Sequence, residues 1–368
     1  MDLALYQPEH GYYLGSTVRS AREGDFLTAA ELHPVFGQVL AGQLAEMWQA
    51  LGHPSPFVLR EYGAGPGTLG LDVLESLRTD ESPLAEHLLY EAIELNPHHR
   101  QTMADRFAAA GLSDRLGLVE EAGRPGGAIP GAGEPSGPPV SGVVLANEFI
   151  DALPVHRVEG DRQGELGELY VTWRDGWFAE DSGEPSTPRL ALYFERLGIA
   201  LAPGQRAEVN LALEDWLDDV AVGLARGYVL VIDYGHPADR LYSTVRQGGT
   251  LRAYRGHVAH ADPFRFIGRQ DLTAHVDLTT LERWAAERGL TTLAKTTQAR
   301  FLVDGGLEGI LEAERAHADL DPERYVALRA AILRLLDPRA LGGFEVVLFG
   351  RDVPADPMPS GFRTAEAA

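Results

Sequence analysis

Carboxylate side chains that flank a glycine-rich stretch are the most distinctive chemical feature of the sequence. The segment EYGAGPGTLG, residues 61–70, begins with Glu61 and has glycine at positions 63, 65, 67 and 70. Glycines at this spacing predict a sharp backbone bend that a bound molecule can approach closely. A second acid, Glu94, ends the next apolar run, where a carboxylate can accept hydrogen bonds from both hydroxyls of a ribose. The stretch therefore predicts a nucleoside-binding site.

The choice of nucleoside depends on two further features of this stretch. Gly65-Pro66-Gly67-Thr68-Leu69-Gly70 satisfies the G-x-G-x-x-G pattern of dinucleotide-binding turns. However, the charge of Glu61 would lie poorly beside a pyrophosphate, and Pro66 removes an N–H group that would otherwise hold a phosphate. S-adenosylmethionine contains a ribose, an ammonium and a sulfonium but no phosphate, so it fits both features. A nicotinamide or flavin dinucleotide, or a flexible turn without a ligand, remains open at this point.

Apolar runs and periodic segments alternate along the chain and predict the elements that position these groups. Expected strands cover 57–62, 87–95, 116–120, 142–149 and 228–235, and expected helices cover 34–51, 68–78 and 97–110. Strands that are apolar on both faces and alternate with helices indicate a covered parallel sheet, an α/β fold. The core is completed by a helix near 210–226 capped by Asn210, a helix from Thr279 with Glu282 at the capping-box spacing, and strands at 290–297 and 344–351.

Changes in composition divide the chain into a core and an insertion. Residues 1–154 form the first part of the expected cofactor-binding core, and residues 208–351 form its second part, with a long excursion at 236–278. Between them, residues 155–207 contain short strand candidates separated by turn residues and predict an inserted strand-rich subdomain. The Pro/Gly-rich segment 122–142 predicts a long mobile loop, and 352–368 predicts a disordered tail.

The overall composition disfavours several classes of function. With 32 Lys and Arg against 54 Asp and Glu, the 368-residue chain has a net charge of −22, which argues against nucleic acid and anionic membranes as partners. It has no cysteine, which removes disulfides and thiolate chemistry, and its histidines show no metal-ligand spacing, so no metal site is predicted. No stretch has the apolar length of a membrane span, and the first residues lack the pattern of an export signal. We therefore expect a cytoplasmic bacterial protein.

Several ordered motifs across the chain resemble those of one known family. They are GYYLG at 11–15, GDFLTAAEL at 24–32, the glycine-rich stretch, ANEFIDALPVHR at 146–157, VIDYGH at 231–236, GTLRAYRGH at 249–257 and DLTAHVDLTTL at 271–281. Together they resemble the MidA family, which is related to the mitochondrial complex I assembly factor that methylates arginine. The resemblance implies a class I S-adenosylmethionine (SAM) methyltransferase fold, in which the last strand inserts antiparallel, and methyl transfer to arginine of a protein.

The resemblance also implies roles for individual residues around the cofactor. Residues of the glycine stretch would hold the methionine part of SAM, and Glu94 would hold its ribose. A segment near the N-terminus would close over the cofactor, although it reads Thr28-Ala29-Ala30-Glu31 where the family usually has Thr-Ser-Pro-Glu. The implied cofactor contacts are Gly24, Asp25, Phe26, Thr28, Glu61, Gly63, Ala64, Gly65, Gly67, Glu94 and Asn147.

An arginine acceptor requires carboxylates or amide oxygens to orient its protonated guanidinium. ANEFID places Asn147, Glu148 and Asp151 at the end of the fourth strand, and we expect the two acids to grip the guanidinium while Asn147 bridges to cofactor or substrate. The alternative is that Glu148 caps a turn and Asp151 begins a helix. The resemblance suggests that the excursion roofs the acceptor site with Asp277 or His275 near the guanidinium, although we favour a surface or structural role for His275.

A second strand end and the identity of the partner leave alternatives open. Asp233 and Tyr234 either line the same pocket or Asp233 caps a turn at Gly235. The expected partner is an arginine-bearing protein, such as a respiratory complex I subunit or its bacterial counterpart, and a homodimer remains open. Two competing functions are an NAD-dependent oxidoreductase and a non-catalytic assembly chaperone that retains the fold.

Overall fold

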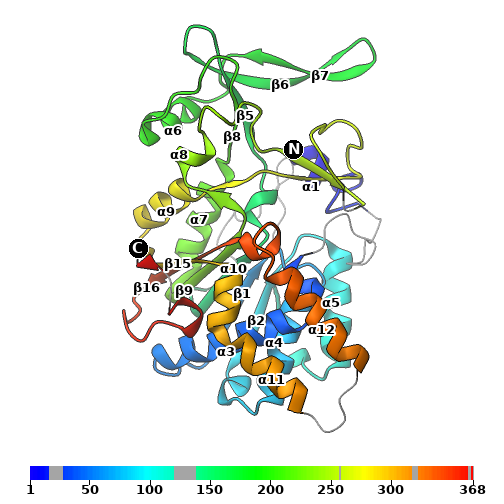
Figure 1. Ribbon diagram of the computed structural model, residues 1–368, viewed down its shortest axis with the longest axis vertical. Coiled ribbons are helices and arrows are strands. Elements are labelled where there is room, and N and C mark those ends of the chain that lie inside the picture. Colours follow the sequence, from blue (N-terminus) through cyan, green and yellow to red (C-terminus); the bar gives the residue numbers. More distant parts are fainter. Residues whose placement is uncertain (16–27, 120–137, 257, 317–321, 364–365, 368) are drawn as a thin grey trace.

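A central sheet of eight strands organises the molecule (Figure 1). The computed structural model describes residues 1–15, 28–119, 138–256, 258–316, 322–363 and 366–367. Within these ranges the strand order is β3–β2–β1–β4–β9–β16–β15–β17. The strands are β1 (Phe57–Tyr62), β2 (Leu88–Ile93), β3 (Leu116–Val119), β4 (Val140–Asn147), β9 (Leu224–Asp233), β15 (Thr291–Thr297), β16 (Glu345–Arg351) and β17 (Glu366–Ala367).

The direction of the strands confirms the expected fold class. β1 pairs in parallel with β2 and β4, β2 with β3, and β4 with β9. β16 lies antiparallel to both of its neighbours, β9 and β15, although it comes after them in the chain. The sheet is therefore an α/β sheet whose late strand inserts antiparallel. The carboxyl ends of β1, β2, β4 and β9 meet at one edge, where ligands bind in such sheets.

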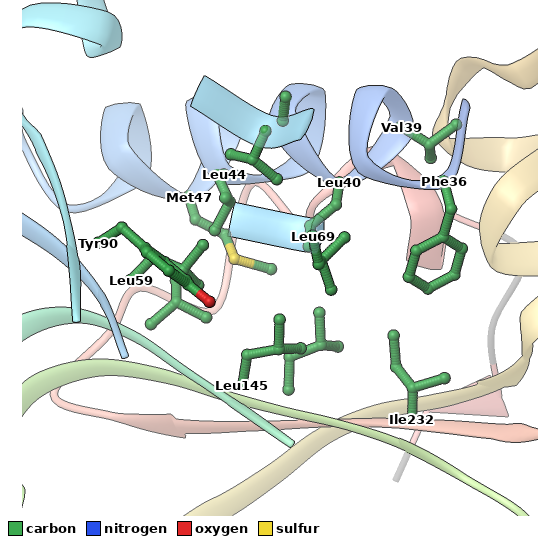
Figure 2. Close-up of a cluster of buried hydrophobic side chains, with 14 of the residues drawn as sticks. Phe36, Val39, Leu40, Leu44, Met47, Leu59, Leu69, Tyr90, Leu145 and Ile232 are labelled. Atoms are coloured by element: carbon green, nitrogen blue, oxygen red, sulfur yellow. The ribbon is translucent and has the colours of Figure 1, made fainter. Parts of the chain in front are cut away.

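Helices α3 (Val35–Ala50), α4 (Thr68–Thr79) and α5 (Pro97–Ala109) cover one face of the sheet. Figure 2 shows how the apolar stripe of α3 lies over the inward side chains of β1, β4 and β9. Its contributing residues are Phe36, Leu40, Leu44 and Met47 of the helix and Leu59, Leu145 and Ile232 of the sheet. Each such side chain stabilises the fold by roughly 1.5–3 kcal/mol when fully buried, so this cluster holds the strand ends in place.

The opposite face is covered by α7 (Ala212–Gly223) and α9 (Leu278–Glu287). The predicted cap of the first helix is confirmed, because Asn210 Oδ1 accepts a hydrogen bond of 3.0 Å from the Leu213 N–H. The predicted start of the second helix is wrong. Asp277, rather than Thr279, is the N-cap, and its Oδ1 accepts from the N–H groups of Thr279 and Thr280.

The expected strand-rich insertion forms a separate antiparallel sheet, with the order β7–β6–β5–β8. Its strands are β5 (His156–Gly160), β6 (Leu166–Arg174), β7 (Trp177–Gly183) and β8 (Arg206–Val209), and α6 (Arg189–Leu197) lies between the last two in the chain. Figure 1 shows that the long β6–β7 hairpin projects beyond the rest of the molecule at the end opposite α11 and α12.

The excursion after β9 folds into two small sheets. We call this part of the chain, from β10 to β14 (residues 235–277), the roof. β11 (Arg252–Arg255), β12 (Val258–His260) and β13 (Asp271–Thr273) form one sheet, and β10 (Gly235–His236) pairs with β14 (Val276–Asp277). Three short helices are α1 (Asp2–Tyr6) and α2 (Ala29–Leu32), near the N-terminus, and α8 (Ala238–Leu241), between β10 and β11. The roof lies directly over the end of β4, because the Ala274 N–H donates to the Asp151 carbonyl at 2.9 Å.

The C-terminal part differs from expectation. After α10 (Gln298–Leu302), α11 (Glu308–Ala316), α12 (Pro322–Leu335) and β16, we expected a disordered tail from residue 352. Instead Ser360–Phe362 forms a 3₁₀ turn, and Phe362 is only 3% exposed. Gln43 of α3 holds this turn, since its Oε1 accepts from the Gly361 N–H at 2.7 Å and its Nε2 donates to Ser360 at 2.8 Å. Partners distant in sequence, rather than local periodicity, order the segment.

Three further features of the sequence analysis concern a mobile loop, membrane spans and metal sites. Most of the predicted mobile loop at 122–142 lies in 120–137, outside the described ranges. None of the helices in the described ranges combines the length and the apolar character needed to cross a membrane. Those same ranges also contain no group of three or more His, Asp and Glu side chains placed to hold a metal ion.

Candidate active site

The chain bends sharply at the glycines that follow β1. Gly63, Gly65 and Gly67 have φ values of +68°, +56° and +72°, in the left-handed region that favours glycine. A β-carbon at Gly67 would lie 2.4 Å from Met103 Cγ, so α5 packs directly against the bend. At Gly65, by contrast, no atom of the described residues lies within 4 Å of the β-carbon position. The middle of the bend therefore opens toward free space that a ligand can fill.

Glu94 faces this opening from the segment after β2. Its Oε2 accepts the Gly65 N–H at 2.7 Å and its Oε1 accepts the Asn96 N–H at 2.7 Å, so two backbone groups fix the orientation of the carboxylate. Each carboxylate oxygen has a further lone pair available. A ribose with its two adjacent hydroxyls can therefore donate to a preset acceptor without any rearrangement of Glu94.

Glu61 closes the inner end of the bend. Its side chain is 4% exposed, and its Oε2 accepts a hydrogen bond of 2.6 Å from the Tyr90 hydroxyl. Burial raises the pKa of this carboxyl from 4.5 to about 7, the Tyr90 hydrogen bond opposes the shift, and the charge of Glu94 adds to it. A cation at the bend would favour the ionised form, whereas a pyrophosphate would be repelled.

The bend forms one wall of a cavity of about 480 Å³ at the carboxyl edge of the sheet. Six carboxyl side chains line it: Glu31, Glu61, Glu94, Glu148, Asp151 and Asp271. Arg106 also lines the cavity, but it donates to the Pro66 carbonyl and to Thr68 and so supports the bend itself. Such a lining suits a ligand with positive charge and does not suit a phosphate.

Glu148 follows β4 with an unusual backbone. Its φ is +50°, a conformation that is uncommon for residues other than glycine and that often occurs at functional sites. Oε1 accepts the Ala29 N–H at 2.8 Å, while Oε2 is buried and accepts no hydrogen bond from the described residues. The neighbouring Asn147 Oδ1 is unpaired in the same sense. Burial, with smaller contributions from Asp151 and Glu31, raises the pKa of Glu148 to about 8.

Asp151 lies on the 3₁₀ turn Ile150–Ala152, which Asp233 at the end of β9 holds in place. Asp233 Oδ2 accepts the N–H groups of Ile150 and Asp151 at 2.9 and 3.1 Å, and its Oδ1 accepts the Tyr234 N–H at 2.9 Å. Asp233 therefore acts as an anchor for the turn and does not line the cavity. Burial and the nearby Asp233 raise the pKa of Asp151 well above its ordinary value.

Three tyrosines and an aspartate complete the cavity, and the sequence analysis assigned none of them a role. Tyr6 and Tyr13 stack with ring centroids 5.5 Å apart, and Tyr12 meets Tyr13 edge-on at 5.1 Å. The Tyr13 hydroxyl donates to Asp271 Oδ1 on the roof at 2.8 Å. The only signal in the sequence was that Tyr12 and Tyr13 lie in the GYYLG motif and Asp271 in DLTAHVDLTTL, whereas Tyr6 lies in neither motif. We call Tyr6, Tyr12 and Tyr13 the tyrosine wall.

Two predicted catalytic residues lie away from the cavity. Asp277 caps α9, and its Oδ2 accepts from the Tyr193 hydroxyl at 2.6 Å and from Thr280 Oγ1 at 2.7 Å. Both contacts lie beside the apolar cluster that α7 and α9 form on their face of the sheet. His275 contacts Tyr234 edge-on at 5.1 Å, and burial lowers its pKa to about 4, so it is neutral near pH 7. Neither residue lines the cavity, and the geometry gives both a structural role.

The remaining predicted contacts divide into two groups. Thr28, Gly63, Ala64, Gly65, Glu94 and Asn147 all line the same cavity as Glu61, Glu148 and Asp151, and Gly67 shapes the bend beside it. Thr28 is also the N-cap of α2, since its side chain accepts the Glu31 N–H. Gly24, Asp25 and Phe26 lie outside the described residues.

Comparison with known families decides which ligand this cavity holds. Residues 39–296 match the Methyltransf_28 family model, described as S-adenosyl-L-methionine-dependent methyltransferases. The chain belongs to this family. Its sheet is that of a class I methyltransferase, and its cofactor is S-adenosyl-L-methionine. The resemblance to the MidA family is thereby confirmed.

Relatives and solved structures agree with this assignment. The methyltransferase is 32% identical to the Drosophila melanogaster protein arginine methyltransferase NDUFAF7 homolog, over 93% of this chain and 78% of the relative. It is 27% identical to human protein arginine methyltransferase NDUFAF7, over 93% and 76%. A Burkholderia thailandensis COG1565 superfamily member, solved with bound S-adenosyl-homocysteine, is 30% identical, with a TM-score of 0.82 over 99% of this chain and 89% of that chain.

The residues present fit this cofactor. The open bend at Gly65, the preset acceptor at Glu94 and the acidic lining match a ribose next to an ammonium and a sulfonium. Bound SAM would supply an activated methyl group for displacement by a nucleophile. The methyltransferase itself would contribute position and charge, with Glu61 beside the cationic part and Asn147 and Glu148 on the side from which an acceptor would approach.

Proposed function

We propose that this methyltransferase transfers the methyl group to the guanidinium of an arginine in a protein. The observation that carries this proposal is Glu148, which stands in a strained backbone conformation beside the cofactor bend and has a buried oxygen with no partner among the described residues. A buried carboxylate oxygen without a partner is costly, so it indicates a ligand group that donates to it. Together with Asp151, it offers a planar donor more than one acceptor, as a guanidinium requires.

The tyrosine wall supports the proposal that the acceptor group is a delocalised cation, such as a guanidinium. Aromatic faces attract a guanidinium through cation–π and stacking contacts, typically by about 0.5–2 kcal/mol. Tyr12 and Tyr13 lie on the same cavity as Asp151, and the hydrogen bond from Tyr13 to Asp271 holds the wall against the roof. An arginine side chain could therefore lie between a tyrosine face and carboxylate oxygens, an arrangement that favours it over the compact ammonium of lysine.

The proposed methyl transfer needs only the cofactor, the guanidinium and a group that takes up one proton. A guanidinium nitrogen forms a bond to the methyl carbon while the carbon–sulfur bond of the cofactor breaks and its electron pair stays on sulfur. The nitrogen then loses a proton, so the products are methylated arginine, S-adenosyl-homocysteine and H⁺. Glu148 is the residue placed to accept that proton or pass it to solvent, because its pKa is raised to about 8.

Raised carboxyl pKa values make acceptor binding dependent on pH. Before a cation enters, burial keeps Glu148 partly protonated near neutral pH and also raises the pKa of Asp151 well above its ordinary value. A guanidinium favours their ionised forms, so its binding releases protons and becomes tighter as the pH rises toward about 8. We expect the rate at low acceptor concentration to rise over the same interval.

The named relatives support the same acceptor. Those in Drosophila melanogaster and Homo sapiens are called protein arginine methyltransferases, which is a statement about them. The family resemblance adds the proposal that the acceptor is a subunit of respiratory complex I or its bacterial counterpart. A cytoplasmic location and the homodimer remain predictions, and the named relatives are mitochondrial.

Quantitative mass spectrometry of arginine methylation tests the proposal. Cells without the protein should lose a methylarginine signal that the wild type restores and that Glu148→Gln and Asp151→Asn fail to restore. Glu86→Gln, a change on the exposed surface away from the cavity, is the matched control and should restore the signal. Unchanged methylarginine in cells without the protein, or loss of methyllysine instead, would contradict an arginine acceptor.

The same variants separate catalysis from a chaperone role. If Glu148→Gln abolishes methylation but leaves assembly of the partner complex intact, the two activities are distinct. The oxidoreductase alternative has no support, because the family match assigns a methyl donor and the acidic lining disfavours a pyrophosphate.

A further inference from the structure

The tip of the β6–β7 hairpin exposes large aromatic side chains. Trp173 is 62% exposed, Trp177 is 77% exposed and Phe178 is 44% exposed. The turn between the strands contains Asp175 and Gly176, with φ values of +51° and +86°, the tight turn type that holds a hairpin rigid. Exposed aromatic groups gathered on a projecting element mark an interaction surface, since they are unfavourable in water and enriched at protein interfaces.

This aromatic tip is joined to the roof of the active site. Phe178 stacks on Phe264 with ring centroids 5.8 Å apart. Phe264 lies in the loop between β12 and β13, which we call the roof loop. The same loop packs on the N-terminal segment, where the β-carbon position of Gly268 lies only 2.1 Å from the His10 carbonyl oxygen. It ends at Asp271, which lines the cavity. The aromatic tip, the roof loop and the rim of the cavity therefore form one continuous stretch of the molecule.

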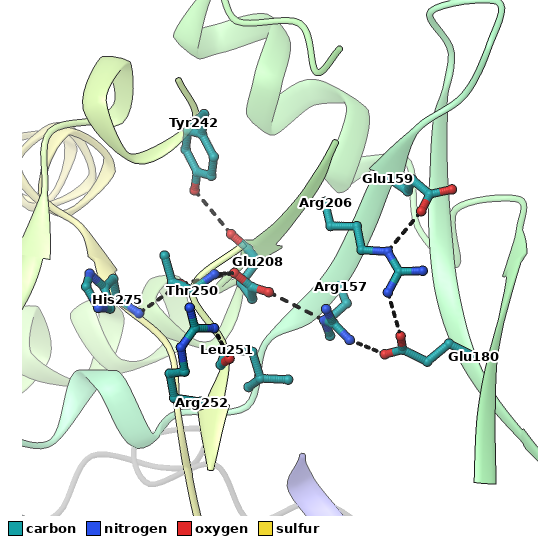
Figure 3. A network of polar contacts seen from close by, with 10 residues as sticks. All are labelled: Arg157, Glu159, Glu180, Arg206, Glu208, Tyr242, Thr250, Leu251, Arg252 and His275. Carbon is teal, nitrogen blue, oxygen red and sulfur yellow. Dashed lines mark hydrogen bonds and ion pairs between the residues drawn. The ribbon is translucent and has the colours of Figure 1, made fainter. Parts of the chain in front are cut away.

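An ion-pair network fixes the base of the hairpin to the roof (Figure 3). Glu180 of β7 pairs with Arg157 and with Arg206, the latter at 3.0 Å. Arg157 Nε lies 3.4 Å from Glu208 Oε1, and Glu208 Oε2 accepts the Thr250 N–H at 2.6 Å, just before β11. The network is partly buried, so salt screens it less than a fully exposed pair. A protein bound to the hairpin would thus have a fixed position relative to the cavity.

The charge of the roof is opposite to that of the chain as a whole. In the part of the roof between residues 252 and 271, four arginines are exposed: Arg252, Arg255, Arg265 and Arg269. Over the same span the acidic residues are Asp262 and Asp271, whereas the whole chain carries −22. Arg255 lies 3.9 Å from the centroid of the Phe266 ring, so cationic and apolar groups alternate on this surface. Its complement is a surface with apolar and acidic groups.

We propose that the hairpin tip and the roof together dock the methyl-accepting protein, through an apolar surface on that protein which also carries acidic side chains. This inference rests on the proposed function, because it requires the acceptor to be a protein. The acceptor arginine enters the acidic cavity, while the area around that arginine contacts Trp173, Trp177 and the roof arginines. Recognition thus uses two sites of opposite charge, one for the reacting side chain and one for its surroundings.

The test compares methyl transfer to whole proteins with binding at the cavity alone. The acceptor probe is protein extract from cells that lack this methyltransferase, incubated with isotopically labelled SAM, and the label is assigned to residues by mass spectrometry. Trp173→Ser/Trp177→Ser should lower labelling of arginine by about tenfold or more, as expected when an interface loses two aromatic anchors. Arg255→Glu/Arg265→Glu should lower it as well and should weaken its dependence on salt.

Matched controls make the outcome specific. Val326→Ser changes a side chain that is 65% exposed on α12, far from the hairpin in Figure 1, and should leave labelling unchanged. All variants should bind S-adenosyl-homocysteine within about twofold of the wild type in calorimetry, because none touches the cavity. Equal labelling by the wild type and the tryptophan variant would overturn the docking proposal. Absence of arginine labelling by the wild type would instead overturn the proposed function.

Discussion

At the scale of residues, carboxyl groups whose ionised forms are disfavoured by burial gather in and directly behind the active-site cavity. Glu61, Glu148, Asp151 and Asp233 stand at the ends of adjacent strands, and burial raises the pKa of each. Their arrangement costs free energy in the empty protein, and a cationic cofactor and acceptor would remove that cost. The site is thus less stable alone than when filled, which is typical of preorganised binding sites.

This cost makes the stability of the ligand-free protein depend on pH. Glu148 has a folded-state pKa of about 8 against an ordinary value of 4.5, so between these values the folded state retains a proton that the unfolded state has lost. Stability should therefore fall as the pH rises through this window, by at most about 1.4 kcal/mol per pH unit for this group. Glu148→Gln should reduce the fall, as measured by urea unfolding at pH 5 and pH 8. A variant with the same pH dependence as the wild type would show that the Glu148 pKa is not raised.

Glu94 allows a second test at this scale. In Glu94→Gln, the amide NH₂ group would replace one of the two oxygens that accept backbone N–H groups from Gly65 and Asn96. One N–H would lose its acceptor and the ribose would lose part of its own, so we expect affinity for S-adenosyl-homocysteine to fall by about 10–100-fold. Calorimetry measures it, with Glu86→Gln on the exposed surface as the control. Unchanged affinity would remove Glu94 from the cofactor site.

At the scale of elements, the sequence predicted what local patterns encode. Strands from β1 to β9 were visible because their residues are apolar on both faces, and the glycine bend was visible because its conformation needs glycine. The role of Asp277 was misjudged, because an acid at the end of a short strand looks the same whether it caps a helix or faces a substrate. Only the packing around it, which brings Tyr193 from the insertion, distinguishes the two.

Contact between α4 and β2 supports the bend, and it leads to a stability prediction. A β-carbon at Gly70 would lie 2.3 Å from Tyr90 Cζ, so Gly70→Ala must push the helix away from the residue that holds Glu61. We expect a loss of about 1–3 kcal/mol in the free energy of unfolding, together with weaker cofactor binding. Gly42→Ala on α3 is the matched control. It meets no described atom within 4 Å and should add about 0.5–1 kcal/mol. Equal effects of the two changes would contradict close packing at Gly70.

At the scale of the whole molecule, contacts between distant parts of the chain determine what the sequence could not show. The C-terminal turn is ordered because Gln43 and Phe301 bind it, and neither residue is near it in sequence. In the same way, Tyr12 and Asp271 both line the cavity although they are far apart in sequence. The net charge of −22 argued against anionic partners, yet the roof presents exposed arginines, so the total charge does not describe the surface around the active site.

Phe362 tests the contribution of this C-terminal turn. Its ring lies 5.4 Å from that of Phe301 and belongs to the main apolar cluster. Phe362→Ala should therefore lower the free energy of unfolding by about 3–5 kcal/mol. Val326→Ala, at an exposed position, should change it by less than about 0.5 kcal/mol. If both variants unfold at the same urea concentration as the wild type, the segment after β16 does not contribute to the fold.

The distribution of the five tryptophans supplies optical probes that need no label. Trp48, Trp216 and Trp284 are buried, whereas Trp173 and Trp177 are exposed on the hairpin. Acrylamide in solution should quench the emission of the hairpin pair and leave that of the buried three nearly unchanged. Shielding of that quenchable fraction on addition of a candidate acceptor would report its arrival at the hairpin, independently of whether a methyl group is transferred.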